Sequence, residues 1–221
     1  MSTTDGQASA DAIERADDGL GDIGLADGPW SLDSAPAGAE FIDFGALQLP
    51  AIAGIKARVE LDTKVRKVGA VSVLVNDCAV QLQVVAARAG KPLWPQVRRS
   101  VLAGLQKGAG HQHVQDGRFG AEVIAQLTVR KSSGLTQDVP MRFVGVDGDK
   151  WMLRAVVTGP SVLSDATVDR VDALISHIAV HRGSDARAEG EVIELSPPPG
   201  QVDYASMPGR EATPEDPASP A

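Results

Sequence analysis

Cysteine and aromatic residues are scarce in this sequence, and it has no long apolar run. The single cysteine, Cys78, excludes an internal disulfide bond and a cysteine-built zinc site, and the lack of a signal-like apolar start indicates a reducing, cytoplasmic setting. Aromatic residues make up 4% of the 221 residues, which leaves little surface for stacking nucleobases. No stretch approaches the roughly 18 apolar residues that a membrane-spanning helix needs. These absences predict a soluble cytoplasmic protein with no membrane partner.

The charges are distributed unevenly along the chain. Residues 1–40 hold nine acids and one base, residues 41–190 hold fourteen acids and nineteen bases, and residues 191–221 hold six acids and one base. The net charge of −8 therefore describes the two ends, and a basic middle lies between them. Arguments about partners have to use the charge of the middle segment rather than that of the whole chain.

This division predicts one domain with two tails. Residues 1–40 show no helical or strand period, so we expect a disordered acidic tail there. Seven of the fourteen prolines follow position 190, so residues 184–221 are expected to form an extended Pro-rich acidic tail. A single α+β domain is expected over residues 41–183, since 221 residues are too few for two large cores.

Each tail has apolar residues that could dock on the domain. Trp30 beside Pro29 is either an anchor for the first tail or an exposed side chain in a flexible segment. Val192, Ile193 and Leu195 precede three prolines and could add to a sheet edge of their own domain or of a partner, with the prolines halting further pairing. The alternative is disorder, because burying three apolar side chains offsets little of the conformational entropy that the segment loses when it becomes ordered.

The middle of the chain alternates between strand and helix patterns. Alternation and β-branching predict strands, and a stripe of apolar residues three and four apart predicts a helix from Trp94 to about Leu105. The expected strands cover residues 46–49, 55–61, 68–75, 80–84, 122–130, 139–146 and 151–157. Asn76-Asp77 and Asp147-Gly148 are hairpin turn signals.

A second helix and a closing strand complete the expected fold. Ser164 or Asp165 can cap a helix whose apolar stripe runs from Val168 to Ile175. Ile178 and Val180 then alternate with histidines in a last strand. The fold class is therefore α+β, with a largely antiparallel sheet and two helices, because hairpins join most neighbouring strands.

The patterns that suggest catalysis or cofactors are weak. Residues 19–24 match GxGxxG, but they lie in an acidic tail that would repel a pyrophosphate and lack the flanking strand and helix. His111 and His113 would project from one face of a strand, yet no third metal ligand is marked by spacing. Cys78 is best interpreted as a small buried residue, since no neighbouring cation lowers its pKa. We expect no catalytic residue, no cofactor and no metal.

The basic residues offer a different kind of site. They cluster at strand ends and on the first helix, at Lys64, Arg66, Lys67, Arg98, Arg99, Arg130 and Lys131. Such groups could contact phosphates. A solvated rim is the favoured interpretation, because a nucleic-acid domain normally shows a denser basic stripe.

Several segments resemble the bacterial domain-of-unknown-function family 3710. The most specific is PMRFVGVDG at residues 140–148, followed by WMLR at 151–154. The others are GPW at 28–30, GALQLP at 45–50, AVQLQ at 79–83, LW at 93–94, FG at 119–120 and GP at 159–160. The resemblance covers residue 28 to about residue 200 and supplies no catalytic residues. The order of strands and helices is also similar to the Mog1/PsbP-like fold, which implies an antiparallel sheet between helices and an adaptor or accessory role.

The leading functional prediction is a non-enzymatic interaction module whose partner is a protein. Its candidate contact residues are Trp30, Arg98, Arg99, Arg130, Lys131, Val192, Ile193 and Leu195. Weak nucleic-acid association through the basic rim is the first alternative. A small-molecule or hydrolytic site in the concavity of the sheet is the second, because catalytic groups need not be adjacent in the chain. The oligomeric state stays open.

Overall fold

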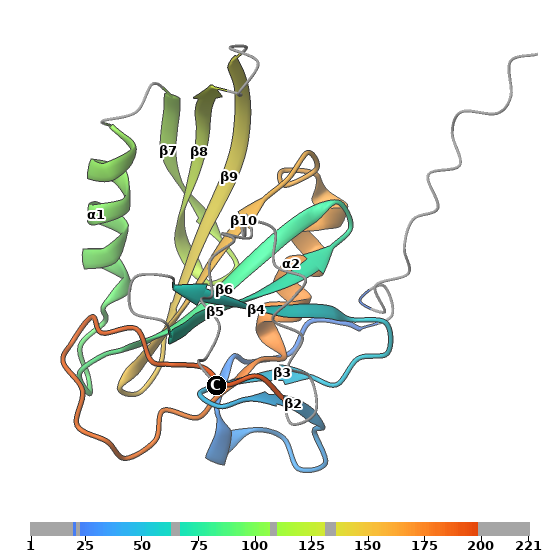
Figure 1. The fold of residues 1–221 in the computed structure, drawn as a ribbon, viewed down its shortest axis with the longest axis vertical. Coiled ribbons are helices and arrows are strands. Elements are labelled where there is room, and N and C mark those ends of the chain that lie inside the picture. The colour runs from blue at the N-terminus through green and yellow to red at the C-terminus, as the bar shows by residue number, and fades with distance from the viewer. Residues whose placement is uncertain (1–19, 21–22, 63–66, 107–109, 131–135, 199–221) are drawn as a thin grey trace, which may run out of the picture.

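The computed structural model describes residues 20, 23–62, 67–106, 110–130 and 136–198. Within these residues it has two β-sheets and two α-helices, α1 (Trp94–Leu105) and α2 (Asp165–Ser176), which confirms the α+β fold class (Figure 1). A seven-stranded sheet has the order β4-β5-β6-β10-β9-β8-β7, and all its pairs are antiparallel. Its strands are β4 (Lys56–Asp62), β5 (Lys67–Val75), β6 (Cys78–Ala86), β7 (Gly110–Gly117), β8 (Gly120–Arg130), β9 (Thr136–Asp147) and β10 (Trp151–Thr158).

A smaller sheet, which the sequence does not predict, packs beneath the large one. Its order is β1-β11-β3-β2, and the strands are β1 (Trp30–Ser31), β2 (Phe41–Phe44), β3 (Leu47–Pro50) and β11 (Ala179–Val180). A short 3-10 helix, Leu32–Ser34, follows β1. The strands predicted at residues 46–49 and from Ile178 to Val180 correspond to β3 and β11. The sequence does not predict β1, β2 or the parallel pairing of β1 with β11 across most of the chain.

The predicted turns form as hairpins. Asn76 adopts a left-handed φ of 54° between β5 and β6, a conformation that Asn tolerates better than most residues. At the β9–β10 turn, the Gly148 amide donates to the Trp151 carbonyl at 2.9 Å, and the left-handed residue is Lys150, with φ of 63°, rather than Gly148. The register pairs Met152 with Asp147, so the hairpin prediction is confirmed.

The main core lies between the inner face of the large sheet, helix α2 and the small sheet. Val80, Leu82 and Val84 on β6 have no exposed surface, whereas the alternating Gln81 and Gln83 point to the other face. This period of two is the alternation that the sequence shows. The Ser164 hydroxyl accepts from the Thr167 amide at 3.3 Å and caps α2, as predicted.

Helix α1 covers only part of the outer face of the large sheet. It contacts β7, β8 and β9, while β4, β5 and β6 lie farther along the sheet (Figure 1). The Trp94 ring packs on Gly145 of β9 so closely that a Cβ there would come within 2.2 Å of it. The Asp147 carboxylate accepts from the Leu93 and Trp94 amides at 2.7 and 3.0 Å. A turn residue therefore caps this helix from 53 residues away.

The described structure continues on both sides of the expected domain, residues 41–183. Leu20, with 1% of its surface exposed, belongs to the main core, and β1 pairs with β11. Ile193 and Leu195 are each 2% exposed in the same core. Residues 1–19 and 199–221, where the remaining tail predictions fall, lie outside the described residues. The similarity in element order to the Mog1/PsbP-like fold stays a prediction.

Candidate functional site: a groove at the fork between β5 and β6

Strands β5 and β6 separate at one end, and a C-terminal segment enters between them. Their pairing ends at Val71 and Leu82. Beyond that point, residues 190–196, here called the strap, supply the missing hydrogen bonds. The Ile193 amide donates to the Val84 carbonyl at 2.8 Å, and the Leu195 amide donates to the Val68 carbonyl at 2.9 Å. The strap therefore satisfies backbone groups that the fork would otherwise leave unpaired.

The strap also fixes both neighbouring layers. The Gly190 amide donates to the Ala86 carbonyl at 2.9 Å, and the Ser196 amide donates to the Phe44 carbonyl of the small sheet at 3.0 Å. Val192 forms an isolated bridge with Val85 and is 41% exposed, while Ile193 and Leu195 are buried. This alternation is that of a strand with one face in the core.

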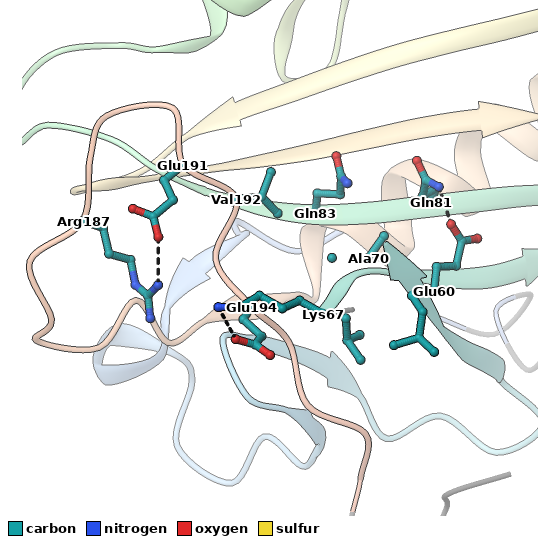
Figure 2. A pocket seen from close by; sticks show the side chains of 12 residues that line it. Glu60, Lys67, Ala70, Gln81, Gln83, Arg187, Glu191, Val192 and Glu194 are labelled. Carbon is teal, nitrogen blue, oxygen red and sulfur yellow. Dashed lines mark hydrogen bonds and ion pairs between the residues drawn. The ribbon is translucent and has the colours of Figure 1, made fainter. Parts of the chain in front are cut away.

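A groove of about 470 Å³, here called the fork groove, lies beside the strap (Figure 2). This volume falls in the range of about 300–1,000 Å³ typical of ligand sites. Its walls come from three parts of the chain: the ends of β4 and β5, strand β6, and the strap with Arg187 before it. The lining residues are Glu60, Leu61, Lys67, Val68, Gly69, Ala70, Gln81, Gln83, Arg187, Glu191, Val192 and Glu194.

Most charges around the fork groove are paired with each other. Lys67 lies 3.0 Å from Glu194, and Arg187 lies 3.3 Å from Glu191. The Gln81 amide donates to the Glu60 carboxylate, and Figure 2 shows these three contacts as dashed lines. Exposed pairs of this kind add little stability, typically about 0–1 kcal/mol. They hold the walls in place and leave little net charge at this end of the groove.

Two polar groups make no such contact, one in the lining of the groove and the other next to it in the sheet. Gln83 lines the groove from β6, and Arg154 of β10 lies directly opposite it in the sheet register. Within the described part of the chain, neither side chain has a hydrogen bond or ion pair, and the Arg154 Nε is buried without an acceptor. Burial lowers the pKa of Arg154 below its usual value.

On the inner face of the same sheet, another arginine is fully buried and contacts two carboxylates. Arg142 of β9 is 1% exposed, and its guanidinium contacts Glu122 of β8 at 2.8 Å and Asp172 of α2 at 2.8 Å. Burial acts to lower the pKa of Arg142, but the hydrogen bond to Glu122 and the charge of Asp172 outweigh it and raise that pKa. Burial also raises the pKa of Asp172, although Arg142 acts against this. The triad ties α2 to the sheet.

A cluster of small polar side chains lies at the start of α2. The Ser161 hydroxyl donates to the Asp77 carboxylate and lies 2.8 Å from the Thr167 hydroxyl. The Cys78 thiol, with no exposed surface, lies 3.4 Å from the same carboxylate. Burial raises the pKa of Cys78, whereas the hydrogen bond from Ser161 lowers the pKa of Asp77. A thiol that is buried and protonated is a poor nucleophile, so the cluster fits a structural role.

The candidate residues of the N-terminal and C-terminal segments pack on the chain itself. Trp30 is half buried, with its ring edge-on to His177 at a centroid distance of 6.3 Å, which is the docked arrangement. Ile193 and Leu195 are buried in the core, so they cannot also contact a partner while the strap is seated. Val192 is the member of this group that lies on the groove surface.

Of the basic candidates, the structure describes the side chains of Lys67 on β5 and of Arg98 and Arg99 on α1. Arg98 donates to the Ala121 carbonyl at 3.2 Å and so braces β8, while Arg99 is exposed on α1. Arg130 ends β8, but its side chain lies outside the described residues, as do Lys131, Lys64 and Arg66. His111 and His113 do share a strand, β7. Among the described residues no group of three or more His, Cys, Asp or Glu side chains could hold a metal ion.

Gln83 and Arg154 are the site residues that sequence reasoning missed. The alternation of β6 places Gln81 and Gln83 on the outer face, which was visible in the sequence. That Gln83 meets Arg154, 71 positions later, depends on the pairing of β6 with β10, which alternation does not specify. The splayed fork and the strap that fills it are likewise long-range features.

Comparison with known sequences identifies the chain at the level of a family. None of the described helices is long and apolar enough to cross a membrane. A search among curated proteins finds no significant match. The family model described as "Protein of unknown function (DUF3710)" matches residues 28–203, a span that includes both sheets, both helices and the strap. The chain therefore belongs to the DUF3710 family.

Proposed function

We propose that this protein is a non-enzymatic cytoplasmic interaction module that binds an extended segment of a partner protein in the fork groove. The observation that carries the proposal is the open outer face of β4, β5 and β6, which α1 leaves uncovered and which ends in the fork groove. Grooves with an apolar floor and a few polar groups are the usual form of a ligand site. Here Val68, Ala70 and Val192 supply apolar surface, and the two glutamines supply amides.

The chemistry of the lining supports binding rather than catalysis. The twelve lining residues include no serine, threonine, cysteine or histidine. The acids Glu60, Glu191 and Glu194 are each engaged by a neighbouring side chain. Glutamine amides, by contrast, can donate to and accept from a peptide backbone. An extended segment is therefore a better fit than a substrate that needs a nucleophile.

The same lining argues against the nucleic-acid alternative. A phosphate backbone in the groove would meet three carboxylates, and Lys67 and Arg187 are already paired with two of them. Like charges near one another disfavour such binding. Cytoplasmic location stays part of the proposal and rests on the single reduced cysteine.

Filling the groove tests the proposal. Gly69 lines the groove, and a Cβ added there would meet no atom within 4 Å, so Gly69→Leu starts a side chain in open space at the groove. Gly104 on α1 has equally open surroundings, which makes Gly104→Leu a matched control.

The measurement is affinity capture from nuclease-treated native lysate, with quantitative mass spectrometry of the bound proteins. We expect Gly69→Leu to lose at least one protein that the wild type and Gly104→Leu retain in equal amounts. If all three capture the same proteins, the groove is not the docking site. If nuclease treatment removes every specific protein, the nucleic-acid alternative replaces the proposal.

A further inference from the structure

Arg154 lies on the outer face of the large sheet with no anion beside it among the described residues. Its Nε is buried and has no acceptor. Along β10, its same-face neighbours are Met152 and Val156, which are 0% and 7% exposed. Across the strands it lies between Gln83 of β6 and Gly145 of β9. The guanidinium therefore sits on an apolar surface with one polar neighbour in register.

Arg154 is only partly buried, but its Nε is withdrawn from water without an acceptor. Buried polar groups in proteins nearly always have a hydrogen-bond partner, and a charged group withdrawn from water without one carries a desolvation penalty. The sheet itself offers a comparison, since Arg142 on the opposite face contacts two carboxylates at 2.8 Å. Arg154 is only partly buried and has no carboxylate beside it among the described residues, so its outer nitrogens are left to an acceptor from outside the chain.

The neighbouring amide points to the same kind of ligand. Gln83 lies opposite Arg154, where side chains on paired strands are within reach of each other. Its amide also lacks a partner among the described residues. A guanidinium binds a carboxylate through two parallel hydrogen bonds, and a nearby amide can donate a third. The apolar surroundings strengthen each of these bonds relative to water.

The charge of the groove selects a single carboxylate over a polyanion. Glu60 and Glu191 line the groove that Gln83 borders, so a chain of phosphates that extended from Arg154 would meet negative charges. A carboxylate on an otherwise neutral segment avoids them, because only its two oxygens need to reach the guanidinium.

We propose that Arg154 and Gln83 form a carboxylate-binding subsite at the β6–β10 side of the fork groove, which takes an aspartate, a glutamate or a terminal carboxylate of the segment that the groove binds. This rests on the proposed function, which supplies the segment. Arg154 provides the charge and the paired donors, and Gln83 fixes the orientation of the carboxylate.

The first test uses simple anions with the full chain. Sodium acetate and sodium phosphate are titrated at constant ionic strength while the arginine Nε–Hε and glutamine side-chain amide signals are followed by NMR. We expect saturable shifts for Arg154 and Gln83 with acetate, and at least tenfold weaker acetate binding in Arg154→Met. Arg99→Met, which removes an exposed charge from α1, should bind acetate as the wild type does. Non-saturating shifts, shifts of equal size at Arg99, or tighter binding of phosphate would overturn the proposal.

Two further measurements distinguish a loss of folding stability from a loss of partner binding. Because Met keeps the apolar stem of Arg154 and removes an unpaired charge, Arg154→Met should unfold at the same urea concentration as the wild type or a higher one. In the capture experiment it should lose the proteins that Gly69→Leu loses. If Gly69→Leu loses them and Arg154→Met keeps them, the subsite fails while the groove function stands. If acetate binds but both variants keep every partner, the groove function fails and with it the assignment of the carboxylate to a partner segment.

Discussion

The strap gives the sharpest test of the fold, because two adjacent residues on it have opposite environments. Ile193 is 2% exposed and belongs to the main core, whereas Val192 is 41% exposed beside the groove. Truncating a buried isoleucine to alanine costs about 2–5 kcal/mol, since the transfer free energy is lost and a cavity remains. Surface truncations usually change stability by less than about 0.5 kcal/mol.

We therefore expect Ile193→Ala to lower the free energy of unfolding by about 3 kcal/mol and Val192→Ala to leave it nearly unchanged. For a domain of ordinary stability, about 5–15 kcal/mol, the first change is a large fraction of the total. Equilibrium urea unfolding followed by circular dichroism measures both variants. The slope of the transition should stay constant, because the same surface is exposed on unfolding.

Amide exchange provides a second measurement of the same contact. The Ile193 and Leu195 amides donate to Val84 and Val68 at 2.8 and 2.9 Å, so both should exchange slowly in the isolated protein. A strap that packs only in a complex would exchange fast in isolation. Equal unfolding free energies for Ile193→Ala and Val192→Ala would refute the burial of the strap.

Three further predictions concern other contacts. Trp151→Ala should cost about 3–5 kcal/mol in urea unfolding, because the ring is 2% exposed and its Nε1 donates to the Ser31 hydroxyl at 2.9 Å; an unchanged midpoint would contradict this. Gly145→Ala should destabilise by about 1–3 kcal/mol through its overlap with Trp94, whereas Gly104→Ala should stabilise α1 by up to about 1 kcal/mol. Asp172 has a raised pKa, so the native state holds its proton more tightly than the unfolded state and gains stability as pH falls through that pKa toward 3.8. Relative to Asp172→Asn, the wild type should therefore become more stable between pH 7 and pH 4, and the opposite trend in urea midpoints would refute the assignment.

Local features of the fold could be predicted from the sequence because their causes are local. The helix from Trp94 to Leu105 follows from apolar spacing, and the cap at Ser164 follows from its hydroxyl and its position before the apolar stripe. The hairpin at Asp147 follows from its turn residues. In each case the residues that determine the structure lie within about a dozen positions of one another.

The pairing of β11 with β1 and β3 could not be predicted, because these strands are distant in sequence. Pairing Trp30 with Ala179 joins segments that show no shared pattern. Alternation also identifies which residues share a face but not what covers that face. Nothing in the local pattern shows that α2 brings Asp172 over Arg142 and buries the charge. The surroundings of Arg154 could not be predicted for the same reason, because they depend on which strands pair with β10.

The strap connects the stability of the core with the proposed groove. Val192, Glu191 and Glu194 form one wall of the groove, and Ile193 and Leu195 hold that wall in position through the core. A partner that binds only the seated strap must therefore stabilise it, by an amount that grows with the ratio of partner concentration to dissociation constant. Conversely, Ile193→Ala should weaken partner binding in proportion to the fraction of molecules in which the strap has left the fork. Because the core already holds this wall in place, a partner that binds there loses little conformational entropy in ordering it. We therefore assign recognition to the groove rather than to the strap.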